Sequence, residues 1–457
     1  MRSCCAPNAE AGKNIAASHP TDERFFVSGD IVAIASELIE SAPTAPGSHG
    51  RTIVIGVLGC GTVGGGVVDR LLKDGRIHGS PVRLARVLVR NLEKPHFPTA
   101  ARAHLTADPA DVVDDPDVDI VVEAIGGTTV ARDLVERALR NGKHVVSANK
   151  ALIAASAGRL ARLAREQHSA FRYEAAVGGA VPVVRAISDV LVAEEIEEIA
   201  GVMNGTSNYI MKRMAAGDEF GDALSAAQAA GYAEPDPTND VEGNDAAQKI
   251  AVLALLAFRQ TLQADRIFRR SLRSLGAGDF AFAARLGYRL VPLTLARRSG
   301  QRLAALVSPA YVAADHDFAR AQGPGNVFRV AGAHSGPLTF LGTGAGSRAT
   351  ASAVLADLAD ICGRLARWEH QRSDELDHPV AVPLAPALPL LLRVEPDSAE
   401  RVAAALSAGG LETVVLAADA VRTGPLRVDR VEGALRSARV APHVCSVFPL
   451  YEDGAVE

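Results

Sequence analysis

The sequence predicts an open α/β domain built on a parallel sheet, followed by an α+β domain and a small C-terminal α/β module. Two observations support this fold class. Between residues 51 and 173, continuous apolar runs of strand length alternate with helical patterns, which is typical of a parallel sheet with helices on both faces. From residue 174 to residue 346 this alternation is lost, and after several prolines it returns in shorter pieces between residues 385 and 451.

The elements of the first domain are predicted in chain order. The predicted strands are TIVIGVLG (52–59), VRLARVLV (82–89), DIVVEAIG (119–126) and KHVVSAN (143–149). The predicted helices are TVGGGVVDRLLKDG (62–75) and TTVARDLVERALRNG (128–142), the second of which closes on Asn-Gly. Because the strands are apolar without alternation, both faces of the sheet are expected to be covered.

The rest of the chain divides into three further parts. In the second domain, helices are predicted over residues 181–192, from near Gly243 to Phe258, and over residues 349–367, with a strand over residues 194–205. In the tail, LLLRV, SAERVAAALSAGG, LETVVLAA, PLRVDRVEGALRSARV and HVCSVFPLY predict the order β-α-β-β-α-β. Residues 1–50 are expected to be a disordered extension, because a marginal helix pattern at 24–40 stands between a patternless start and a Pro/Gly/Ser linker.

The composition is that of an ordinary globular chain. The 457 residues are 48% hydrophobic and 22% charged, and a net charge of -5 gives no electrostatic footprint for nucleic acid or an anionic membrane. No run of eighteen apolar residues predicts a membrane span, and the first fifty residues lack a secretory signal. The five cysteines form no C-x-x-C, so we expect neither a disulfide framework nor a zinc site, and a cytoplasmic location.

The first predicted strand ends in a glycine loop. GVLGCGTVGGGV contains G-x-G-x-x-G at Gly59, Gly61 and Gly64, with Thr62 and Val63 inside the motif. The first glycine permits a tight turn, the second lets a pyrophosphate approach the backbone, and the third allows close helix–strand packing. A glycine-rich turn without a cofactor is the alternative, but the position between a strand and a helix favours a dinucleotide.

The end of the second strand bears on which dinucleotide binds. An acid there would hold the ribose 2′-OH of NAD, whereas a basic residue accommodates the 2′-phosphate of NADP. The strand ends VLVRNLEK, with Arg90 and Lys94 and no acid immediately at its end. This favours NADP(H) over NAD(H), unless Arg90 merely faces solvent.

Two further motifs carry ionisable groups in positions suited to chemistry. SANK places Lys150 just past the carboxyl end of a strand, where ligands of open α/β sheets bind, although most surface lysines are only solvated charges. In GYAEPDPTNDVEGNDAAQK (231–249), no frame gives the EF-hand spacing, while a solvated turn stays possible. Asp245 and Lys249 share one face of a predicted helix that continues into KIAVLALL, so the pair points toward packed protein.

Five strings in this order resemble homoserine dehydrogenase. They are HVVSANKALIA, FRYEAAVGGAVPVVRAI, GVMNGTSNYIMKRM, GYAEPDPTNDVEGNDAAQKIAVLALLAF and GTGAGSRATASAVLADL. The resemblance runs from about Ile53 to Arg364, and the Asn-Gly-Thr-Ser-Asn-Tyr and Gly-Tyr-Ala-Glu-Pro-Asp-Pro strings are highly specific to that family. No aspartokinase domain precedes it, so the monofunctional form is expected.

The resemblance implies roles for residues in these strings. Lys249 would donate the proton to the aldehyde oxygen, Lys150 would be the other essential lysine beside cofactor and substrate, and Glu234 and Asp245 would bind the substrate ammonium. Gly231 and Gly344 would approach the cofactor, although a helix C-cap and an ordinary turn before a helix are the alternatives. A sodium site would use Glu174 with the carbonyls of Val177, Gly179 and Val181, unless this is only a Gly-Gly turn between domains.

The predicted fold is therefore an α/β Rossmann-type nucleotide-binding domain (51–173), an α+β substrate and dimerisation domain (174–346), a helix packing back on the first domain (347–372), and an ACT-like module (385–451). Since EPDSAERV lacks the Asp-x-Pro-Gly turn usual at the effector end, threonine inhibition through this tail is in doubt. The family implies a homodimer or homotetramer.

The predicted function is reversible reduction of L-aspartate 4-semialdehyde to L-homoserine with NAD(P)H, on the route to threonine, methionine and isoleucine. Two alternatives stay open at this point. The chain could be another Rossmann oxidoreductase of amino-acid-derived carbonyls, or a catalytically inactive nucleotide-binding sensor of amino acids.

Overall fold

The computed structural model describes residues 51–93, 99–366 and 378–453. Three parts of the prediction lie outside these ranges. They are the N-terminal extension with its helix at 24–40, Lys94, and the end of the helix predicted over 347–372. Within the described ranges, no helix combines the length and apolarity that crossing a membrane requires.

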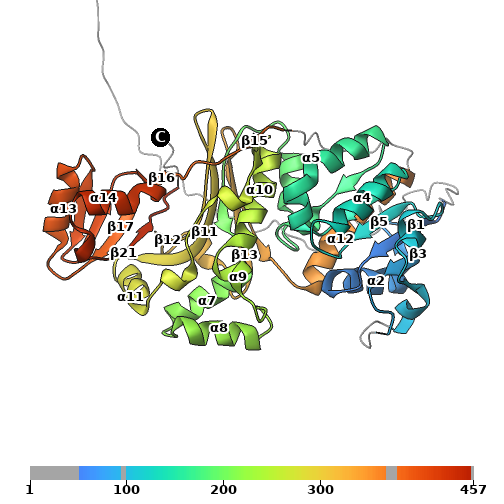
Figure 1. Ribbon diagram of the computed structural model, residues 1–457, viewed down its shortest axis with the longest axis horizontal. Coiled ribbons are helices and arrows are strands. Elements are labelled where there is room, and N and C mark those ends of the chain that lie inside the picture. The colour runs from blue at the N-terminus through green and yellow to red at the C-terminus, as the bar shows by residue number, and fades with distance from the viewer. Residues whose placement is uncertain (1–50, 94–98, 367–377, 454–457) are drawn as a thin grey trace, which may run out of the picture. The chain divides into compact units, whose positions relative to one another are not determined.

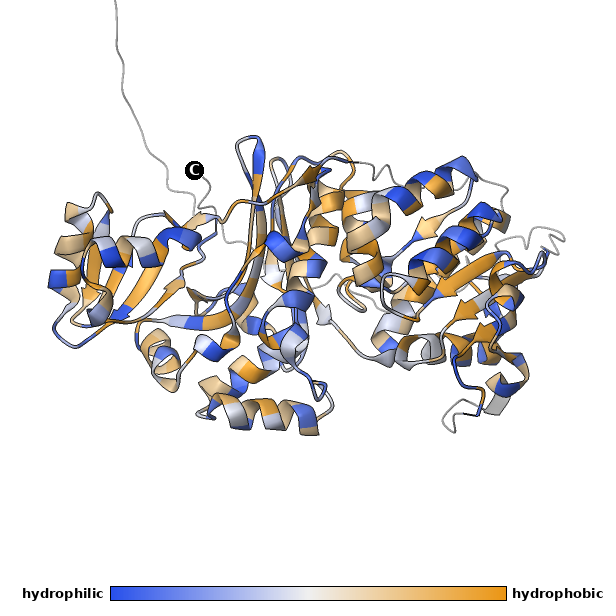
Figure 2. Cartoon of the chain, in the orientation of Figure 1, coloured by the Kyte–Doolittle hydropathy of each residue, from blue (hydrophilic) through white to orange (hydrophobic). Residues whose placement is uncertain are grey.

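The first domain is built on the predicted parallel sheet. Its parallel strands run in the order β4-β3-β1-β5-β6-β7, with the short β2 (Arg76–Ile77) antiparallel beside β3. Their bounds are β1 (Ile53–Leu58), β3 (Ser80–Leu88), β4 (Leu105–Thr106), β5 (Ile120–Glu123), β6 (His144–Ser147) and β7 (Phe171–Arg172). The strand and helix predictions for this domain are confirmed, and Figure 2 shows these strands as apolar segments.

Helices cover both faces of this sheet (Figure 1). On one face, Val54 and Leu58 of β1 share a core with α3 (Ala110–Val113), α4 (Val130–Arg140) and α5 (Lys150–Glu166). On the other, Ile53, Ile55 and Val57 pack with α2 (Thr62–Asp74) and with α12 (Ser347–Ala366). Successive strand residues point to opposite faces, so an apolar strand without alternation is buried on both sides.

The second domain contains a six-stranded sheet. The strand order is β10-β12-β11-β8-β13-β14, and all neighbours are antiparallel except β10 and β12. The strands are β8 (Ile196–Val202), β10 (Phe268–Arg269), β11 (Tyr288–Ser299), β12 (Arg302–Ala313), β13 (Gly325–Gly332) and β14 (Gly336–Thr343). The helices that matter for the site are α7 (Gly205–Ala215), α8 (Phe220–Ala229), α9 (Thr238–Val241) and α10 (Asn244–Phe258).

One predicted helix of this domain is only partly right. Residues 181–192 were expected to form one helix, but the structure has a single turn, α6 (Val183–Arg185), that runs into a π-helical turn over Ala186–Val190. The carboxylate of Glu174 accepts hydrogen bonds from the amides of Val184 and Arg185 and so caps the turn from outside the segment. Apolar periodicity does not register such a cap, nor the wider i→i−5 turn that follows.

The tail forms the predicted β-α-β-β-α-β order. Its elements are β17 (Leu390–Val394), α13 (Ala399–Ala408), β18 (Thr413–Ala417), β19 (Ala420–Thr423), α14 (Val431–Ser437) and β21 (Val444–Pro449). The antiparallel sheet has the order β18-β19-β17-β21, and α13 and α14 pack against one of its faces. Beyond β21, the Leu450 amide donates to Pro389 O and the Tyr451 amide to Tyr311 O, which ties the end of the module to the second domain.

Candidate active site

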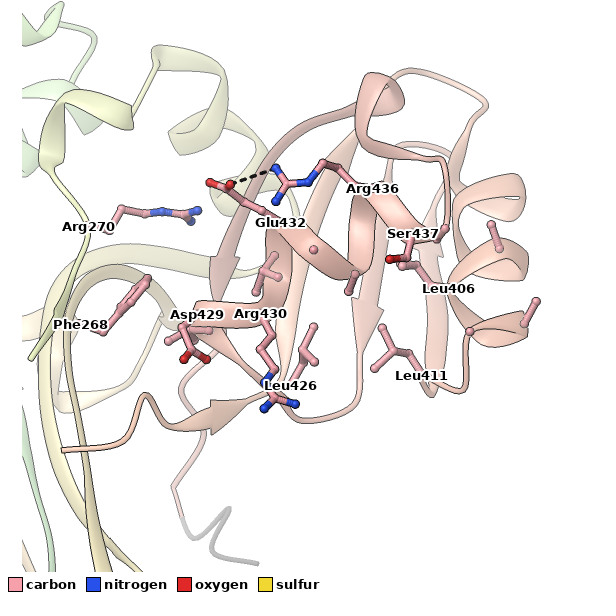
Figure 3. Close-up of a pocket in the computed structure, with 18 of the residues that line it drawn as sticks. Phe268, Arg270, Leu406, Leu411, Leu426, Asp429, Arg430, Glu432, Arg436 and Ser437 are labelled. Carbon is pink, nitrogen blue, oxygen red and sulfur yellow. Dashed lines mark hydrogen bonds and ion pairs between the residues drawn. The ribbon is translucent and has the colours of Figure 1, made fainter. Parts of the chain in front are cut away.

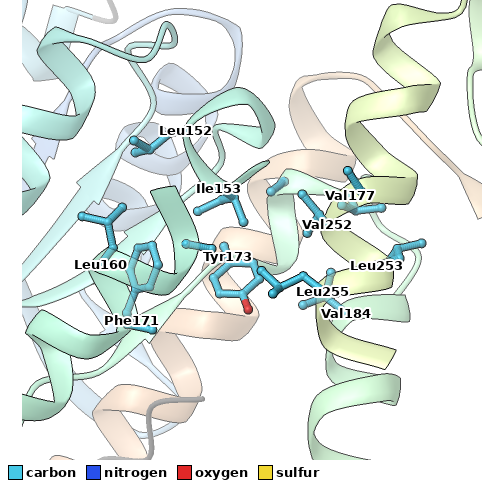
Figure 4. Close-up of a cluster of buried hydrophobic side chains, with 14 of the residues drawn as sticks. Leu152, Ile153, Leu160, Phe171, Tyr173, Val177, Val184, Val252, Leu253 and Leu255 are labelled. Atoms are coloured by element: carbon cyan, nitrogen blue, oxygen red, sulfur yellow. The ribbon is translucent and has the colours of Figure 1, made fainter. Parts of the chain in front are cut away.

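Helices α5 and α10 bring two predicted site lysines together. Leu152, Ile153 and Leu160 of α5 belong to one apolar cluster with Val252, Leu253 and Leu255 of α10 (Figure 4). Lys150 is the first residue of α5 and Lys249 lies in the first half of α10. Because one continuous core holds both helices, the backbone positions of the two lysines are fixed relative to each other.

A buried carboxylate joins these two lysines. Asp245 Oδ1 lies 2.9 Å from Lys150 Nζ, and Asp245 Oδ2 lies 2.8 Å from Lys249 Nζ. The side chains of Asp245 and Lys249 are each 11% exposed, whereas that of Lys150 is 38% exposed. The i, i+4 pairing expected for Asp245 and Lys249 is present in the structure, and Lys150 joins it from the first domain.

The backbone after β8 completes the surroundings of Lys249. Lys249 Nζ donates to Met203 O at 2.7 Å, and Asn204 Nδ2 donates both to Asp245 Oδ2 at 2.9 Å and to Asp240 Oδ1 at 2.7 Å. Asn204 is also the N-cap of α7, since its Oδ1 accepts from the Ser207 amide. A single asparagine therefore anchors a helix and bridges two carboxylates.

The electrostatics of the cluster follow from burial and charge. Burial alone would raise the pKa of the Asp245 carboxyl, but the ammonium groups of Lys249 and Lys150 outweigh burial and hold this pKa well below its usual range. Asp245 in turn raises the pKa of the Lys150 ammonium against the effect of its burial. Burial raises the pKa of Asp240, with partial compensation from the Asn204 amide. The cluster thus keeps Asp245 ionised and Lys150 protonated at neutral pH.

The cluster opens into a cavity of about 590 Å³. Lys150, Asp245 and Asp240 line it together with Glu234, which is exposed, and with Val63 at the start of α2. Gly126, Gly127 and Asn149, which follow the carboxyl ends of β5 and β6, complete one wall. The cavity therefore lies where ligands of open α/β sheets bind.

The acidic stretch 231–249 divides into turns and a helix start. Gly231 follows α8 with φ 73, as a C-cap glycine does, and Asp236 Oδ1 accepts from the Thr238 amide. Gly243 is the N-cap of α10 with φ 75, and a Cβ there would lie 2.8 Å from Val307 Cγ1. These residues shape the loop that delivers Glu234 and Asp245 to the same cavity.

The glycine loop has the local geometry that a dinucleotide needs. A Cβ on Gly59, whose φ is 100, would lie 2.7 Å from Ala124 O, and a Cβ on Gly64 would lie 2.0 Å from Gly59 O. A Cβ on Gly61 would meet nothing within 4 Å, so this backbone faces open space at the N-terminus of α2. Gly59 and Gly64 are thus needed for packing and Gly61 for access, which fits a bound pyrophosphate.

This difference predicts that two glycine-to-alanine changes act on different properties. Gly64→Ala is expected to lower the free energy of unfolding by about 1–3 kcal/mol, because the new methyl overlaps the Gly59 carbonyl. Gly61→Ala is expected to leave that free energy unchanged but to raise the Kd for the dinucleotide by about 10- to 100-fold, because the new methyl group keeps the pyrophosphate from approaching the backbone and so weakens about one hydrogen bond to a charged group. Urea unfolding and fluorescence titration measure the two effects, and wild-type affinity in Gly61→Ala would contradict a dinucleotide at this loop.

The other predicted cofactor residues lie in different surroundings. Arg90 is exposed just past β3 and has no ion-pair partner among the residues that the structure describes. Gly344 is buried, and a Cβ there would lie 2.0 Å from the side chain of Asn326. Its loop leads to α12, where Ser347 Oγ donates to Thr62 O at 2.6 Å in the glycine loop. The glycine loop and the Gly344 loop therefore touch.

The residues of the expected sodium site lie in one segment, between Glu174 and Val181. Gly178 and Gly179 both have positive φ, 83 and 59. Burial, followed by the neighbouring Asp357 carboxyl, raises the pKa of Glu174 to about 8, although its oxygens accept two backbone amides. Within the described ranges, no group of three His, Cys, Asp or Glu side chains is placed to hold a metal.

Sequence reasoning missed several residues that organise the site. Glu123 is fully buried at the end of β5 and accepts hydrogen bonds from the Ile125 and Gly126 amides and from Ser147 Oγ and Asn149 Nδ2. Asn149 caps α5 directly before Lys150. An Asn before a helix is a readable N-cap signal, and both Asn149 and Asn204 carry it. Of the partners of Glu123, Ser147 and Asn149 come close to it only because β6 pairs with β5.

A larger cavity, of about 1130 Å³, lies between β10 and the two tail helices (Figure 3). None of the predicted site residues lines it. Three of its four arginines are already engaged: Arg269 and Arg270 donate to backbone carbonyls, and Arg436 pairs with Glu432. The cavity lacks the combination of lysine and carboxylate found at Lys150 and Asp245.

Comparisons with known proteins identify the family of the chain. The family model for homoserine dehydrogenase matches residues 182–359, and that for its NAD-binding domain matches residues 59–174. A homoserine dehydrogenase of Pseudomonas aeruginosa is 40% identical over 343 residues, which cover 72% of this chain and 79% of the relative. Homoserine dehydrogenase structures from Thiobacillus denitrificans and S. aureus superpose with TM-scores of 0.79 and 0.70, at 36% and 29% identity, over 88% and 89% of this chain and 99% and 100% of theirs. The chain therefore belongs to the homoserine dehydrogenase family of oxidoreductases, whose NAD-binding domain it carries.

Proposed function

We propose that the chain reduces L-aspartate 4-semialdehyde to L-homoserine, reversibly, for threonine, methionine and isoleucine biosynthesis. The reaction takes place at the cluster of Asp245, Lys150 and Lys249. The observation that carries this proposal is that one buried carboxylate holds two ammonium groups beside a cavity that also touches the glycine loop. A nicotinamide cofactor, when bound, supplies the hydride that the aldehyde carbon receives. The protein must then stabilise and protonate the oxygen.

Lys249 is the proton donor in this proposal. Its ammonium group has three N–H donors, of which one points to Asp245 Oδ2 and one to Met203 O. The third remains for the carbonyl oxygen, where an ammonium group stabilises the developing negative charge and then transfers a proton. Lys150, which is more exposed and lines the cavity, would orient the substrate and contact the cofactor.

Glu234 and Asp245 remain the proposed partners of the substrate ammonium. Asp245 Oδ2 already accepts two hydrogen bonds, from Lys249 and Asn204, whereas Oδ1 accepts one from Lys150. Glu234 is exposed at the cavity and free to turn toward a ligand. We therefore give Glu234 the larger share of ammonium binding and Asp245 the role of fixing the lysines.

We further propose that the chain prefers NADP(H), held by Gly59, Gly61, Thr62, Val63, Gly64, Arg90, Lys150, Gly231 and Gly344. Arg90 supports this, since its guanidinium is exposed past β3. Arg90→Ala is expected to raise the KM for NADPH by about 10- to 100-fold, the worth of a hydrogen bond to a charged group, and to leave the KM for NADH unchanged. Steady-state assays with both cofactors measure this, and equal effects on the two would contradict the role of Arg90.

The sodium site and the assembly are part of the same proposal. Glu174 with the carbonyls of Val177, Gly179 and Val181 suits a hard monovalent cation, and the high pKa of the buried Glu174 carboxyl is consistent with a need for positive charge nearby. Exposed Leu338 and Leu341 on the edge strand β14 support a homodimer or homotetramer.

We propose the same domain division as the sequence predicts, at residues 51–173, 174–346, 347–372 and 385–451, with an ACT-like tail.

A direct assay tests the proposed reaction. NADPH absorbance is followed with aspartate 4-semialdehyde as the substrate, and with homoserine and NADP in reverse. Turnover in both directions is the expected result. No turnover at saturating substrate would contradict the proposed reaction and would favour an inactive amino-acid sensor.

A further inference from the structure

We propose that Asn326 is a positioning residue that fixes the direction in which Lys249 donates its proton. The proposal rests on the proposed function of Lys249. It concerns a side chain that does not line the 590 Å³ cavity and that acts through the backbone carbonyl of Met203.

Asn326 and Lys249 share that carbonyl. Asn326 Nδ2 donates to Met203 O at 3.1 Å, and Lys249 Nζ donates to the same oxygen at 2.7 Å. Met203 follows β8 directly, and β8 pairs with β13 so that Val202 lies opposite Val327. Asn326, one residue before Val327, is thereby held next to the carbonyl, and both Asn326 and Met203 are fully buried.

The shared carbonyl determines where the free N–H of Lys249 points. A carbonyl oxygen has two lone pairs, and here both are used. An ammonium group is tetrahedral, so fixing two of its N–H directions, toward Asp245 and toward Met203, fixes the third. Without the Asn326 amide the carbonyl of Met203 loses one of its two partners. This carbonyl is the only anchor of Lys249 besides Asp245 within the described ranges, so the anchor itself is then held less firmly.

The surroundings of Asn326 indicate that its side-chain amide has a role other than stabilising the fold. Asn326 Oδ1 is buried and has no hydrogen-bond partner among the described residues, which is a destabilising arrangement. Gly344 leaves room for the side chain, because a Cβ there would lie 2.0 Å from Asn326 Cγ. A small apolar residue at position 326 would avoid the unpaired oxygen, so a purely structural account does not explain an asparagine.

Asn208 provides a matched control. It is an equally buried asparagine on α7 whose Nδ2 donates to Ala321 O and Gly323 O, in the loop that leads to Asn326. It therefore holds the same part of the fold. No hydrogen bond of Asn208 to Met203, Asp245 or Lys249 occurs within the described ranges.

The test compares Asn326→Ala with Asn208→Ala in the full-length chain. Asn326→Ala is expected to lower kcat by about 10- to 100-fold, as for a displaced catalytic group, with the KM for NADPH unchanged and the melting temperature close to that of the wild type. Its solvent deuterium isotope effect on kcat is expected to rise, because a misdirected donor makes proton transfer more rate-limiting. Asn208→Ala is expected to lower the melting temperature and to leave the isotope effect unchanged.

Wild-type kcat and isotope effect in Asn326→Ala would overturn the proposal, as would the same rise of the isotope effect in both variants. Absence of turnover in the wild type would instead overturn the proposed function. Loss of activity in Lys249→Met together with wild-type behaviour of Asn326→Ala would leave Lys249 as the donor and remove only the positioning role.

Discussion

Replacing Lys249 with methionine is expected to lower kcat for aldehyde reduction by about 10²- to 10⁴-fold, the usual contribution of a general acid. Methionine keeps the length of the side chain but removes the ammonium group that binds Asp245 Oδ2 and Met203 O. The KM for the cofactor is expected to stay unchanged, because the ammonium group of Lys249 binds Asp245 and Met203 rather than the glycine loop. Initial rates of NADPH oxidation and urea unfolding measure activity and stability on the same samples.

Lys212 gives the control for this variant. It lies half-buried on α7 of the same domain, and no ion pair of its ammonium is present within the described ranges. Lys212→Met is therefore expected to behave like the wild type. Turnover in Lys249→Met within a few-fold of the wild type would contradict the donor role, and a loss in Lys150→Met would then reassign the proton to Lys150.

The sequence predicts the first domain and the ion pair of Asp245 with Lys249 because both depend on local patterns. Apolar runs of strand length report burial directly, and a spacing of four residues places two side chains on one face of a helix. Lys150 was placed at the site by its position after a strand and by resemblance, and the 2.9 Å contact with Asp245 agrees with this. Its pairing partner, 95 residues later, was not predicted.

Contacts between distant segments account for most of what sequence reasoning missed. Met203 contributes its backbone carbonyl to the site, so no pattern of side chains in the sequence predicts its role. Asn204 reaches Asp240 and Asp245 only because α7 starts where β8 ends, beside α10. The sequence predicts the α12 helix after the glycines at 342–346, but its contact with the glycine loop, through Ser347 Oγ and Thr62 O, depends on the complete fold.

The second large effect is expected from Asp245→Asn. The asparagine has nearly the same shape but presents one oxygen and one NH₂ group to two lysines, so one ammonium group must face a donor. Lys150 can turn toward solvent, since it is 38% exposed, whereas Lys249 at 11% cannot. Breaking a buried pair costs about 3–5 kcal/mol, and we expect a loss of that order in the free energy of unfolding, with activity reduced at least as much as in Lys249→Met.

The pH dependence of this loss follows from the pKa shifts. The pKa of Asp245 is lower in the folded chain than its ordinary value of 3.8, so its stabilisation is fully present above that value and disappears only as the pH falls toward the folded-state pKa. The pKa of Lys150 is higher in the folded chain than 10.5, so its share is present below that value and disappears as the pH rises through the folded-state pKa. The difference in unfolding free energy between wild type and Asp245→Asn should therefore be constant from about pH 5 to pH 9 and shrink below about pH 4.

A double-mutant cycle with Lys150→Met separates the two ion pairs of Asp245. If the pair with Lys150 couples the domains, Lys150→Met should destabilise the wild type but have little effect in the Asp245→Asn background. Arg90→Met, at an exposed position past β3, serves as the additive control. Urea unfolding at pH 7 gives the four free energies for each cycle. Equal effects of Lys150→Met in both backgrounds would mean that the 2.9 Å contact does not hold the domains together, and that the shared apolar core of α5 and α10 alone positions the two lysines.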